Sequence, residues 1–277
     1  MSLFVASLNS GSNGNCYYVG NSEEAVLIDG GISCREIEKR LKRLGLSIRK
    51  VKGVFVSHEH GDHVHGIPSL AKKHNIPVYI TKDTFNNANL TLSVDRTRKL
   101  VSRDQMQIGG LTIKAFPKLH DAADPISFVI SSDTVNVGVF TDIGFACENV
   151  ISHFSQCHAA FLESNYDETM LEQGRYPFSL KNRIRGGHGH LSNKQALQLF
   201  TKYRPAFMSH LFLVHLSKNN NHPRIVKETF YPVAGQTQII IASREKETAL
   251  FHIRHLGQVI EKRAKATEKF AEQLSIF

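Results

Sequence analysis

The segment VFVSHEHGDHVHGI, residues 54–67, gathers histidine and carboxylate side chains directly after an apolar run. His58 and His60 are two residues apart, and Asp62 and His63 follow closely enough to serve a second cation beside the first. Imidazole and carboxylate ligands together suit zinc, manganese or iron better than magnesium or calcium, which prefer oxygen alone. An isolated H-x-H pair would fit a solvated loop equally well, but H-x-H-x-D-H after an apolar strand is far more specific. The segment therefore predicts a metal-binding loop.

Apolar runs separated by turn residues predict the strands that must hold this loop. The predicted strands are LFVASLN, CYYVG, AVLID, GVFVS, PVYIT, LTIKAF, ISFVIS, VNVGVF, AAFLES, AFMSHLFLVHLS and TQIIIAS. The histidine loop begins where GVFVS ends, and TDIG follows VNVGVF in the same way. Ligand-type residues are therefore expected at the ends of more than one strand.

Helix signals lie between these strands. Ser33 and Glu36 match the S-x-x-E capping box, and Gly45 ends the apolar period that follows them. Further helices are predicted at 67–74, at 168–173, at 178–185, from Asn193 behind a Ser192 cap, and at 256–277. The mixed order of strands and helices predicts a fold of the α/β class.

The composition fits one folded domain. A chain of 277 residues, 41% of them hydrophobic, can bury a sizeable core as one large domain or two small ones. No short-period repeat or linker rich in proline and glycine interrupts it, which favours a single domain over residues 1–277 with a helix at 256–277. The formal charge of +9 suits a polyanionic partner, but an ordinary basic protein can carry the same charge.

The cysteines and the first residues bear on location. The four cysteines form no CxxC pair, and MSLFVASLNSGSNGNC has neither the basic region nor the long apolar core of a secretory signal. No run approaches the roughly 18 apolar residues of a membrane span. We therefore expect a cytoplasmic protein with reduced thiols.

Five motifs resemble those of the metallo-β-lactamase-fold hydrolases in their order and in their placement at strand ends. They are LIDGG, SHEHGDH, KLHDAADPISF, FTDIG and LVHLS, and the resemblance spans about residues 3–243. It implies an αββα sandwich with a site for two divalent metal ions along one edge, most readily zinc or manganese, with iron as a third candidate. The ligands that it implies are His58, His60 and His120 for one metal, Asp62, His63 and His215 for the other, Asp142 as the bridge, and Asp29 as a support below the histidine loop.

Taken singly, several of these residues have simpler explanations. His120 could be an ordinary loop histidine, Asp142 could cap a helix, and His215 could be an imidazole packed in an apolar strand. Asp29 stands before two glycines, where an aspartate often only fastens a turn. Together with the first loop, however, these residues complete a set of three ligands, three ligands and a bridge.

Two further segments, FLESNYD and GHGHLSNKQALQLF, resemble the tRNA-trimming ribonuclease Z branch of this fold. The resemblance implies that Glu163 orients His190 as a general acid, while a hydroxide bridging the two metals attacks phosphorus and Asp62 serves catalysis as a ligand. Such an acid suits phosphodiester cleavage, because the leaving group is an alkoxide. Thioester hydrolysis expels a thiolate and needs none. His190 could instead be a simple helix cap beside Ser192.

A narrower set of motifs resembles the YycJ/WalJ-like exonuclease branch. It comprises SGSNGNCYYV, LIDGGIS, ESNYDETML, GRYPFSLKNRIRGGHGHLSN and HLSKNNNHP. This resemblance implies a 5′-to-3′ exonuclease with single-stranded DNA as its partner, and neither a membrane nor an obligate protein partner is expected. Only 22 positions separate His120 from Asp142, too few for the long tRNA-grasping insertion of ribonuclease Z.

Two other classes of function remain open. One is a small-molecule hydrolase of the same fold, such as a thioesterase, for which Glu163 and His190 would be dispensable. The other is a DNA-binding protein that keeps the fold without catalysis, which an incomplete ligand set would favour. Candidate phosphate and substrate contacts are Ser10, Ser12, Asn13 and Asn15 in a loop that could equally be a plain hairpin turn, together with Lys181, Arg183 and Asn221.

Overall fold

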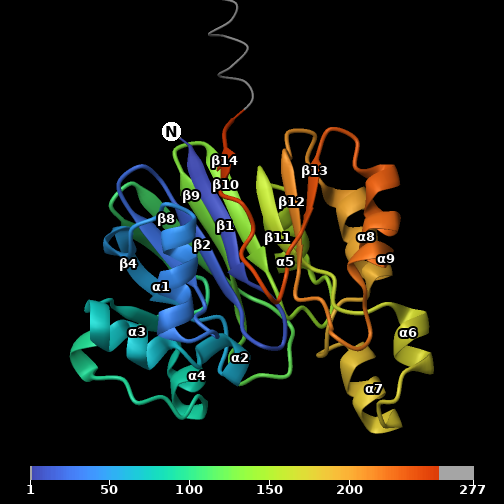
Figure 1. Ribbon diagram of the computed structural model, residues 1–277, viewed down its shortest axis with the longest axis horizontal. Helices are drawn as coiled ribbons and strands as arrows, with labels where there is room; N and C mark the ends of the chain where they lie inside the picture. Colours follow the sequence, from blue (N-terminus) through green and yellow to red (C-terminus); the bar gives the residue numbers. More distant parts are fainter. Residues whose placement is uncertain (1, 256–277) are drawn as a thin grey trace, which may run out of the picture.

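Two seven-stranded β-sheets lie face to face in the computed structural model, which describes residues 2–255 (Figure 1). The first sheet has the order β14-β1-β2-β3-β4-β5-β6, and the second has the order β13-β12-β11-β10-β9-β8-β7. The strands of the first sheet are β1 (Leu3–Asn9), β2 (Cys16–Gly20), β3 (Ala25–Ile28), β4 (Val51–Phe55), β5 (Val78–Ile80), β6 (Thr97–Lys99) and β14 (Phe251–Ile253). Those of the second are β7 (Gln105–Ile108), β8 (Leu111–Pro117), β9 (Ile126–Ser132), β10 (Val135–Phe140), β11 (Ala159–Glu163), β12 (His210–Val214) and β13 (Gln238–Ile241).

Helices cover the outer faces of both sheets. Apolar residues of α1 and α3 pack on the first sheet, and those of α5, α8 and α9 pack on the second. The helices are α1 (Cys34–Arg43), α2 (Gly61–Val64), α3 (Ile67–His74), α4 (Lys82–Asn87), α5 (Glu148–Phe154), α6 (Glu168–Gln173), α7 (Phe178–Arg185), α8 (Asn193–Tyr203) and α9 (Pro223–Phe230), with short 3-10 turns η1 (Ile48–Lys50), η2 (Val94–Arg96) and η3 (Tyr231–Val233). This arrangement confirms the predicted αββα sandwich.

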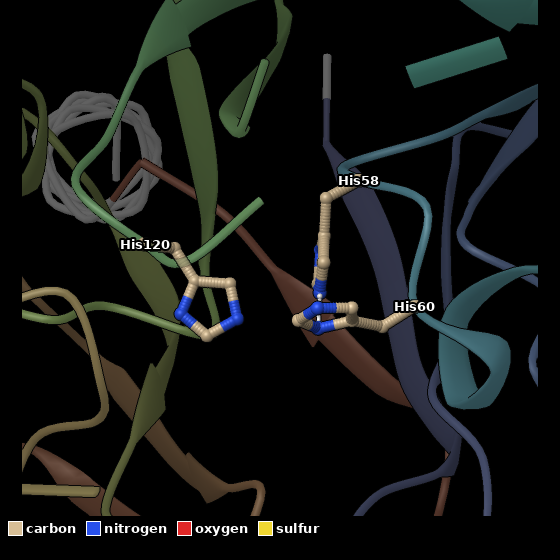
Figure 2. Close-up of side chains that lie close together, drawn as sticks. All are labelled: His58, His60 and His120. Carbon is tan, nitrogen blue, oxygen red and sulfur yellow. Dashed lines mark hydrogen bonds between the residues drawn. The ribbon is translucent and has the colours of Figure 1, made fainter. Parts of the chain in front are cut away.

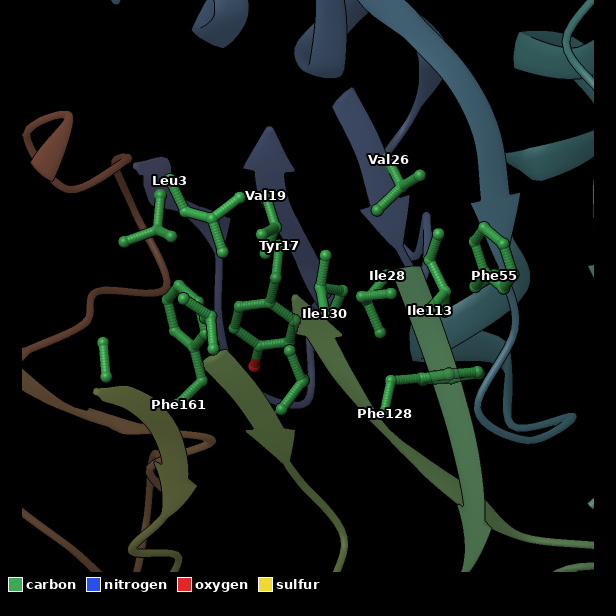
Figure 3. Close-up of a cluster of buried hydrophobic side chains, with 14 of the residues drawn as sticks. Leu3, Tyr17, Val19, Val26, Ile28, Phe55, Ile113, Phe128, Ile130 and Phe161 are labelled. Carbon is green, nitrogen blue, oxygen red and sulfur yellow. The ribbon is translucent and has the colours of Figure 1, made fainter. Parts of the chain in front are cut away.

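The core lies between the two sheets, where aromatic side chains from opposite sheets meet (Figure 3). Phe55 of β4 and Phe128 of β9 have ring centroids 5.7 Å apart in an edge-on contact, and Tyr17 of β2 and Phe161 of β11 are 5.0 Å apart. All four rings are buried. Each such side chain contributes about 1.5–3 kcal/mol when it is removed from water, so this layer fixes the relative position of the sheets.

Parallel pairing brings the functional loops to one edge. β3 runs parallel to β4, and β10, β11, β12 and β13 run parallel to one another. The carboxyl ends of parallel strands meet at the same edge of a sheet. The loops after β10 and β12 therefore lie together at one edge of the second sheet, and the loop after β4 in the first sheet meets them there, since His63 Nε2 is 3.2 Å from Asp142 Oδ2.

Two glycines allow the loops of the first sheet to touch. A Cβ at Gly31 would lie 1.7 Å from the carbonyl oxygen of Asp62, and a Cβ at Gly66 would lie 1.9 Å from that of Ile32. The Gly30 amide also donates to the carbonyl of His63 at 2.8 Å. The glycines of LIDGG are therefore needed for backbone contact with the histidine loop.

The predicted helices at 67–74, 168–173 and 178–185 agree with α3, α6 and α7. The long strand predicted at AFMSHLFLVHLS is shorter, since β12 begins only at His210 after a turn. The helix predicted at 256–277 lies outside the described residues. No helix within residues 2–255 is long and apolar enough to cross a membrane.

Candidate metal centre

Three histidines from two loops form the first group of ligand-type side chains (Figure 2). His58 and His60 follow β4, and His120 follows β8 on the opposite sheet. One ring nitrogen of each lies within 4.8 Å of the others, and His58 Nε2 is 3.1 Å from His60 Nδ1. His120 Nδ1 donates to the carbonyl of Gly189 at 3.0 Å, which leaves its Nε2 free to act as a ligand.

A second group lies beside the first. Asp62 and His63 belong to α2, and His215 follows β12. Asp62 Oδ2 is 3.6 Å from His63 Nε2 and 3.5 Å from His215 Nε2, and the three side chains meet the same 4.8 Å criterion. Both groups thus have the members expected from the sequence.

Asp142 lies between the two groups. Its Oδ1 is 3.8 Å from His120 Nε2 of the first group and 3.4 Å from His215 Nδ1 of the second. Its Oδ2 is 3.2 Å from His63 Nε2. Asp142 and His215 both have positive φ angles, 54° and 57°, a backbone conformation that is uncommon for residues other than glycine and that often occurs at functional sites. A single carboxylate therefore reaches both groups.

Buried polar atoms without a hydrogen-bond partner indicate whether the site residues fit a metal ion. His120 Nε2, Asp142 Oδ2 and His215 Nε2 are buried and make no hydrogen bond within the described part of the chain. Leaving a buried polar atom without a partner costs about 1–3 kcal/mol. Divalent cations at the two groups would satisfy these atoms, and their nitrogen and oxygen chemistry suits a borderline metal such as zinc. The site residues therefore fit a divalent metal cofactor.

The pKa values of the first group favour metal binding. Burial lowers the pKa of His58 well below its usual range and lowers that of His120 to about 4. Both imidazoles are neutral near pH 7, as a metal ligand must be.

In the second group, the charges of neighbouring side chains outweigh burial in setting the pKa values. Burial alone would lower the pKa of His63, but the carboxylates of Asp142, Asp62 and Asp29 outweigh it and raise the pKa to about 10. Burial alone would raise the pKa of Asp142, but the imidazoles of His215 and His63 hold it well below its usual range. The buried negative charge thus demands compensation. Divalent cations can supply it in place of the imidazole protons.

Asp29 orients His63 from outside the ligand set. Asp29 Oδ2 accepts from His63 Nδ1 at 2.7 Å and from Ser57 Oγ at 2.8 Å, while Oδ1 accepts from the Ser57 amide at 2.7 Å. These bonds place the other ring nitrogen of His63 toward Asp142. Such carboxylate partners fix the tautomer of a metal-binding histidine.

Glu163, at the end of β11, contacts two histidines. Its Oε1 accepts from His190 Nδ1 at 2.7 Å and from His215 Nδ1 at 2.9 Å, and its Oε2 accepts from the amides of Ile143 and Leu191. Burial alone would raise the pKa of Glu163. The charge of the His190 imidazole and the hydrogen bonds from His190 and His215 outweigh burial and lower this pKa to about 2. The sequence predicted the bond to His190 only. The bond to His215 shows that the same carboxylate also orients a member of the second group.

An open pocket of about 520 Å³ leads to these groups. It is lined by His60, Asp62, Asp142, His190 and His215. Three cationic side chains, those of Arg183, Lys218 and Arg244, also line it. Lys218 and Arg244 were not identified from the sequence, although HLSK places Lys218 three residues after a predicted ligand.

The predicted substrate contacts divide into two sets. Ser12 and Arg183 line this pocket. The side chains of Ser10, Asn15 and Asn221 are buried instead, and Asn13 and Lys181 bond to the carbonyls of Arg244 and Glu172. Asn15 Nδ2 donates to Asp62 Oδ2 at 3.1 Å, and Ser10 Oγ accepts from the His215 amide at 2.7 Å. The structure places these two residues behind the ligand groups.

A separate cluster contains Cys34, Glu38 and His74, between α1 and α3. Glu38 is already bonded to His74 Nε2 at 2.6 Å and to Lys73 Nζ at 2.7 Å. Burial raises the pKa of the Cys34 thiol, and so do the charge of Glu38 and its hydrogen bond to the thiol. The charge of Lys73 lowers this pKa, but by less than the other effects raise it. The Lys73 ammonium and the His74 imidazole already pair with the Glu38 carboxylate, so this cluster is an ion-pair network.

The sequence and the structure both match known proteins. The model of the family described as β-lactamase superfamily domain matches residues 24–216. Exodeoxyribonuclease YycJ of Bacillus anthracis is 33% identical over 230 residues, which cover 82% of this chain and 87% of that protein. Exodeoxyribonuclease WalJ of Streptococcus pneumoniae serotype 2 is 27% identical over 237 residues, or 84% and 88% of the two chains. The metallo-β-lactamase fold protein YhfI of Bacillus subtilis superposes with a TM-score of 0.67 at 18% identity, covering 91% of this chain and all of that one.

Proposed function

Because this chain belongs to the β-lactamase superfamily and is a metal-dependent hydrolase of that superfamily, we propose that it is a 5′-to-3′ single-stranded DNA exonuclease. Two relatives that match most of its length are named exodeoxyribonucleases. The identity to them makes a phosphodiester the first substrate class to consider. The residues at the site decide between that class and the alternatives.

The observation that carries the proposal is the pair formed by Glu163 and His190 at the pocket. His190 lines the pocket and its side chain is about one-fifth exposed, whereas Glu163 is buried below it. Because His190 Nδ1 is bonded to Glu163, Nε2 is the ring nitrogen that can give a proton to a substrate. A carboxylate-held imidazole of this kind is a general acid, which an alkoxide leaving group needs and a thiolate does not.

We assign two divalent ions to the site, which the two groups and Asp142 would hold. When bound, they lower the pKa of water and neutralise charge on the phosphate. His58, His60 and His120 would hold one ion, and Asp62, His63 and His215 the other. Zinc and manganese suit this mixture of nitrogen and oxygen ligands best, and iron is the third candidate.

The chain's own residues perform the proton transfer and the positioning. His190 Nε2 donates its proton to the departing 3′-oxygen, and Glu163 stabilises the imidazolium before the transfer. The amides of Ile143 and Leu191 fix the Glu163 carboxylate, so the imidazole keeps its orientation. Arg183, Lys218 and Arg244 around the pocket contact the phosphates that flank the cleaved bond.

A thioesterase and a DNA-binding protein without catalysis are the competing proposals. To distinguish them, metal-loaded protein is incubated in parallel with single-stranded DNA labelled at the 5′ end, the same DNA labelled at the 3′ end, RNA of the same sequence, and a glutathione thioester. We expect the 5′ label to be released as a mononucleotide from the start, while the 3′-labelled strand shortens progressively.

Hydrolysis of the thioester alone would overturn the proposal in favour of a thioesterase. Tight DNA binding without turnover on any substrate would favour the binding protein. Equal cleavage of RNA and DNA would correct the proposed preference for DNA.

A further inference from the structure

Helix α7 is unusual because none of its eight residues is buried in the described structure, although three are large and apolar. Leu180 and Ile184, four residues apart on one face, line the metal pocket. Phe178, at the start of the helix, lies on a different side of it, is 71% exposed, and has the Arg185 guanidinium 5.6 Å from the centroid of its ring. Figure 1 shows α6 and α7 beyond the edge of the second sheet, away from the helices that cover its outer face. The face of α7 that carries Leu180 and Ile184 is thus turned to the pocket and not to a core.

The charge of α7 complements a nucleic acid strand. The helix carries Lys181, Arg183 and Arg185 and no carboxylate. Arg183 pairs with Asp121 on the pocket wall, and Arg185 pairs with Glu172 of α6. The Arg183 and Arg185 side chains are 60% and 38% exposed, so both can exchange these partners for phosphate oxygens.

The end of α7 is fastened to the proposed acid. The His190 amide donates to the carbonyl of Ile184 at 2.8 Å, and the Gly189 amide donates to that of Gly186 at 2.8 Å. A Cβ at Gly189 would lie 2.2 Å from the carbonyl oxygens of Arg183 and Ile184. These contacts hold α7 at a fixed distance from His190. A nucleotide bound to α7 would therefore keep a fixed position relative to the bond that His190 helps to cleave.

We propose that α7 is a clamp for a single DNA strand. Leu180 and Ile184 contact the sugar and base of the nucleotide next to the cleaved phosphate, Phe178 stacks on a neighbouring base, and Arg183 and Arg185 contact phosphates. The proposal rests on the proposed function, and it adds recognition of unpaired bases to it. Exposed aromatic rings beside a cationic groove bind single strands with little sequence preference, because every base has a flat face.

The test compares Phe178→Ala with a matched control, Phe207→Ala. Phe207 is 39% exposed and precedes β12, so it lies at the strand edge opposite the metal centre. Each variant is assayed on a 12-nucleotide DNA, on the same DNA with a single abasic position moved along its length, and on methyl p-nitrophenyl phosphate, which has no base. Binding of the 12-nucleotide DNA is measured separately by fluorescence anisotropy.

We expect Phe178→Ala to lower kcat/KM on the 12-nucleotide DNA at least tenfold more than on methyl p-nitrophenyl phosphate, mainly through KM, and to weaken DNA binding. Wild-type protein should be less active on the DNA whose abasic position falls where Phe178 stacks than on the other abasic DNAs. The Phe178→Ala variant should cleave all of the abasic DNAs equally well. Phe207→Ala should behave as the wild type on every substrate.

Equal losses on the two substrates would overturn the clamp, because they would mean that Phe178 supports the metal site or the fold and not the binding of bases. An unchanged abasic profile in the variant would overturn it as well. If the wild type cleaves the small phosphodiester and neither cleaves nor binds DNA, the proposed function fails and the clamp fails with it. If DNA is cleaved and Phe178→Ala matches Phe207→Ala, only the clamp fails.

Discussion

At the scale of single residues, Asp142 has the largest consequence for metal binding. It is the one carboxylate in the proposed ligand set that approaches His120 as well as His63 and His215. We expect wild-type protein to contain about two equivalents of divalent metal by elemental analysis, and Asp142→Ala to lose both or retain them weakly. Activity should fall with the metal content. An Asp142→Ala variant with full metal content and full activity would refute the bridging assignment.

Most of the proposed ligand residues could be grouped from the sequence because they belong to short, specific motifs. His58, His60, Asp62 and His63 lie within six positions, so spacing alone indicated a metal loop. The contact between Glu163 and His215 could not be predicted in this way. It depends on the parallel pairing of β11 with β12, which places residues 52 positions apart side by side.

The substrate contacts were also harder to predict, because they too depend on how distant parts of the chain pack together. The loop that contains Asn15 is rich in Gly, Ser and Asn, a composition that fits both a phosphate nest and a support for other side chains. Burial decides between them, and Asn15 is fully buried against Asp62. No pattern in one sequence reports that burial.

At the scale of elements, the junction between α7 and the His190 loop can be tested through its glycines. Gly189→Ala would force a methyl group against the carbonyls of Arg183 and Ile184, whereas a Cβ at Gly187 would meet nothing within 4 Å. We expect Gly189→Ala to lower kcat on DNA about tenfold or more, because a shift of His190 by a fraction of an ångström misaligns the proton donor.

Gly187→Ala is the matched control for this change, and it should stay close to wild type. Steady-state kinetics on DNA and thermal unfolding together separate a local shift from a loss of fold. Gly189→Ala as active as Gly187→Ala would show that the close contact at this junction does not matter for catalysis.

Helices and strands that have a signal in their own sequence were predicted well. Strands that form only because they pair with a neighbouring strand were not predicted. α8 begins at a complete capping box of Ser192 and Gln195, which the sequence indicates directly. β6, with the sequence TRK, has no apolar alternation and is only partly buried. It is a strand because β5 offers it a hydrogen-bonding edge. Such strands depend on tertiary pairing, so the sequence pattern did not reveal them.

At the scale of the whole molecule, three cationic side chains from distant parts of the chain meet at one pocket. The net charge of +9 was compatible with many partners. The fold brings Arg183, Lys218 and Arg244, which are far apart in the sequence, to the rim of one pocket. This convergence, which composition cannot show, favours a polyanionic substrate.

The charge distribution predicts a salt dependence. If these three cations neutralise about three phosphates of a single strand, log affinity should fall with log salt with a slope of about −2. Lys218→Ala should reduce that slope by about 0.7. Lys39→Ala, which removes an exposed cation on α1, should leave it unchanged. DNA affinities from fluorescence anisotropy between 50 and 200 mM salt test this, and a flat dependence would contradict phosphate-dominated binding.

In the proposed reaction His190, held by Glu163, protonates an alkoxide leaving group. His190→Ala removes the proton donor but none of the proposed metal ligands. His188→Ala, a change at an exposed histidine two residues away, is the matched control. Glu163→Gln should resemble His190→Ala more mildly, because it keeps the imidazole and weakens its orientation.

The most direct measurement is the turnover of wild type and His190→Ala on two phosphodiesters, one with an ordinary nucleoside 3′-oxygen and one with a nitrophenolate as leaving group, alongside metal content. We predict that His190→Ala keeps its metal, loses about 10²-fold or more in kcat on the first substrate, and loses much less on the second, because nitrophenolate leaves without protonation. Equal losses on both substrates, accompanied by loss of metal, would contradict the account and make His190 a metal ligand or a structural cap.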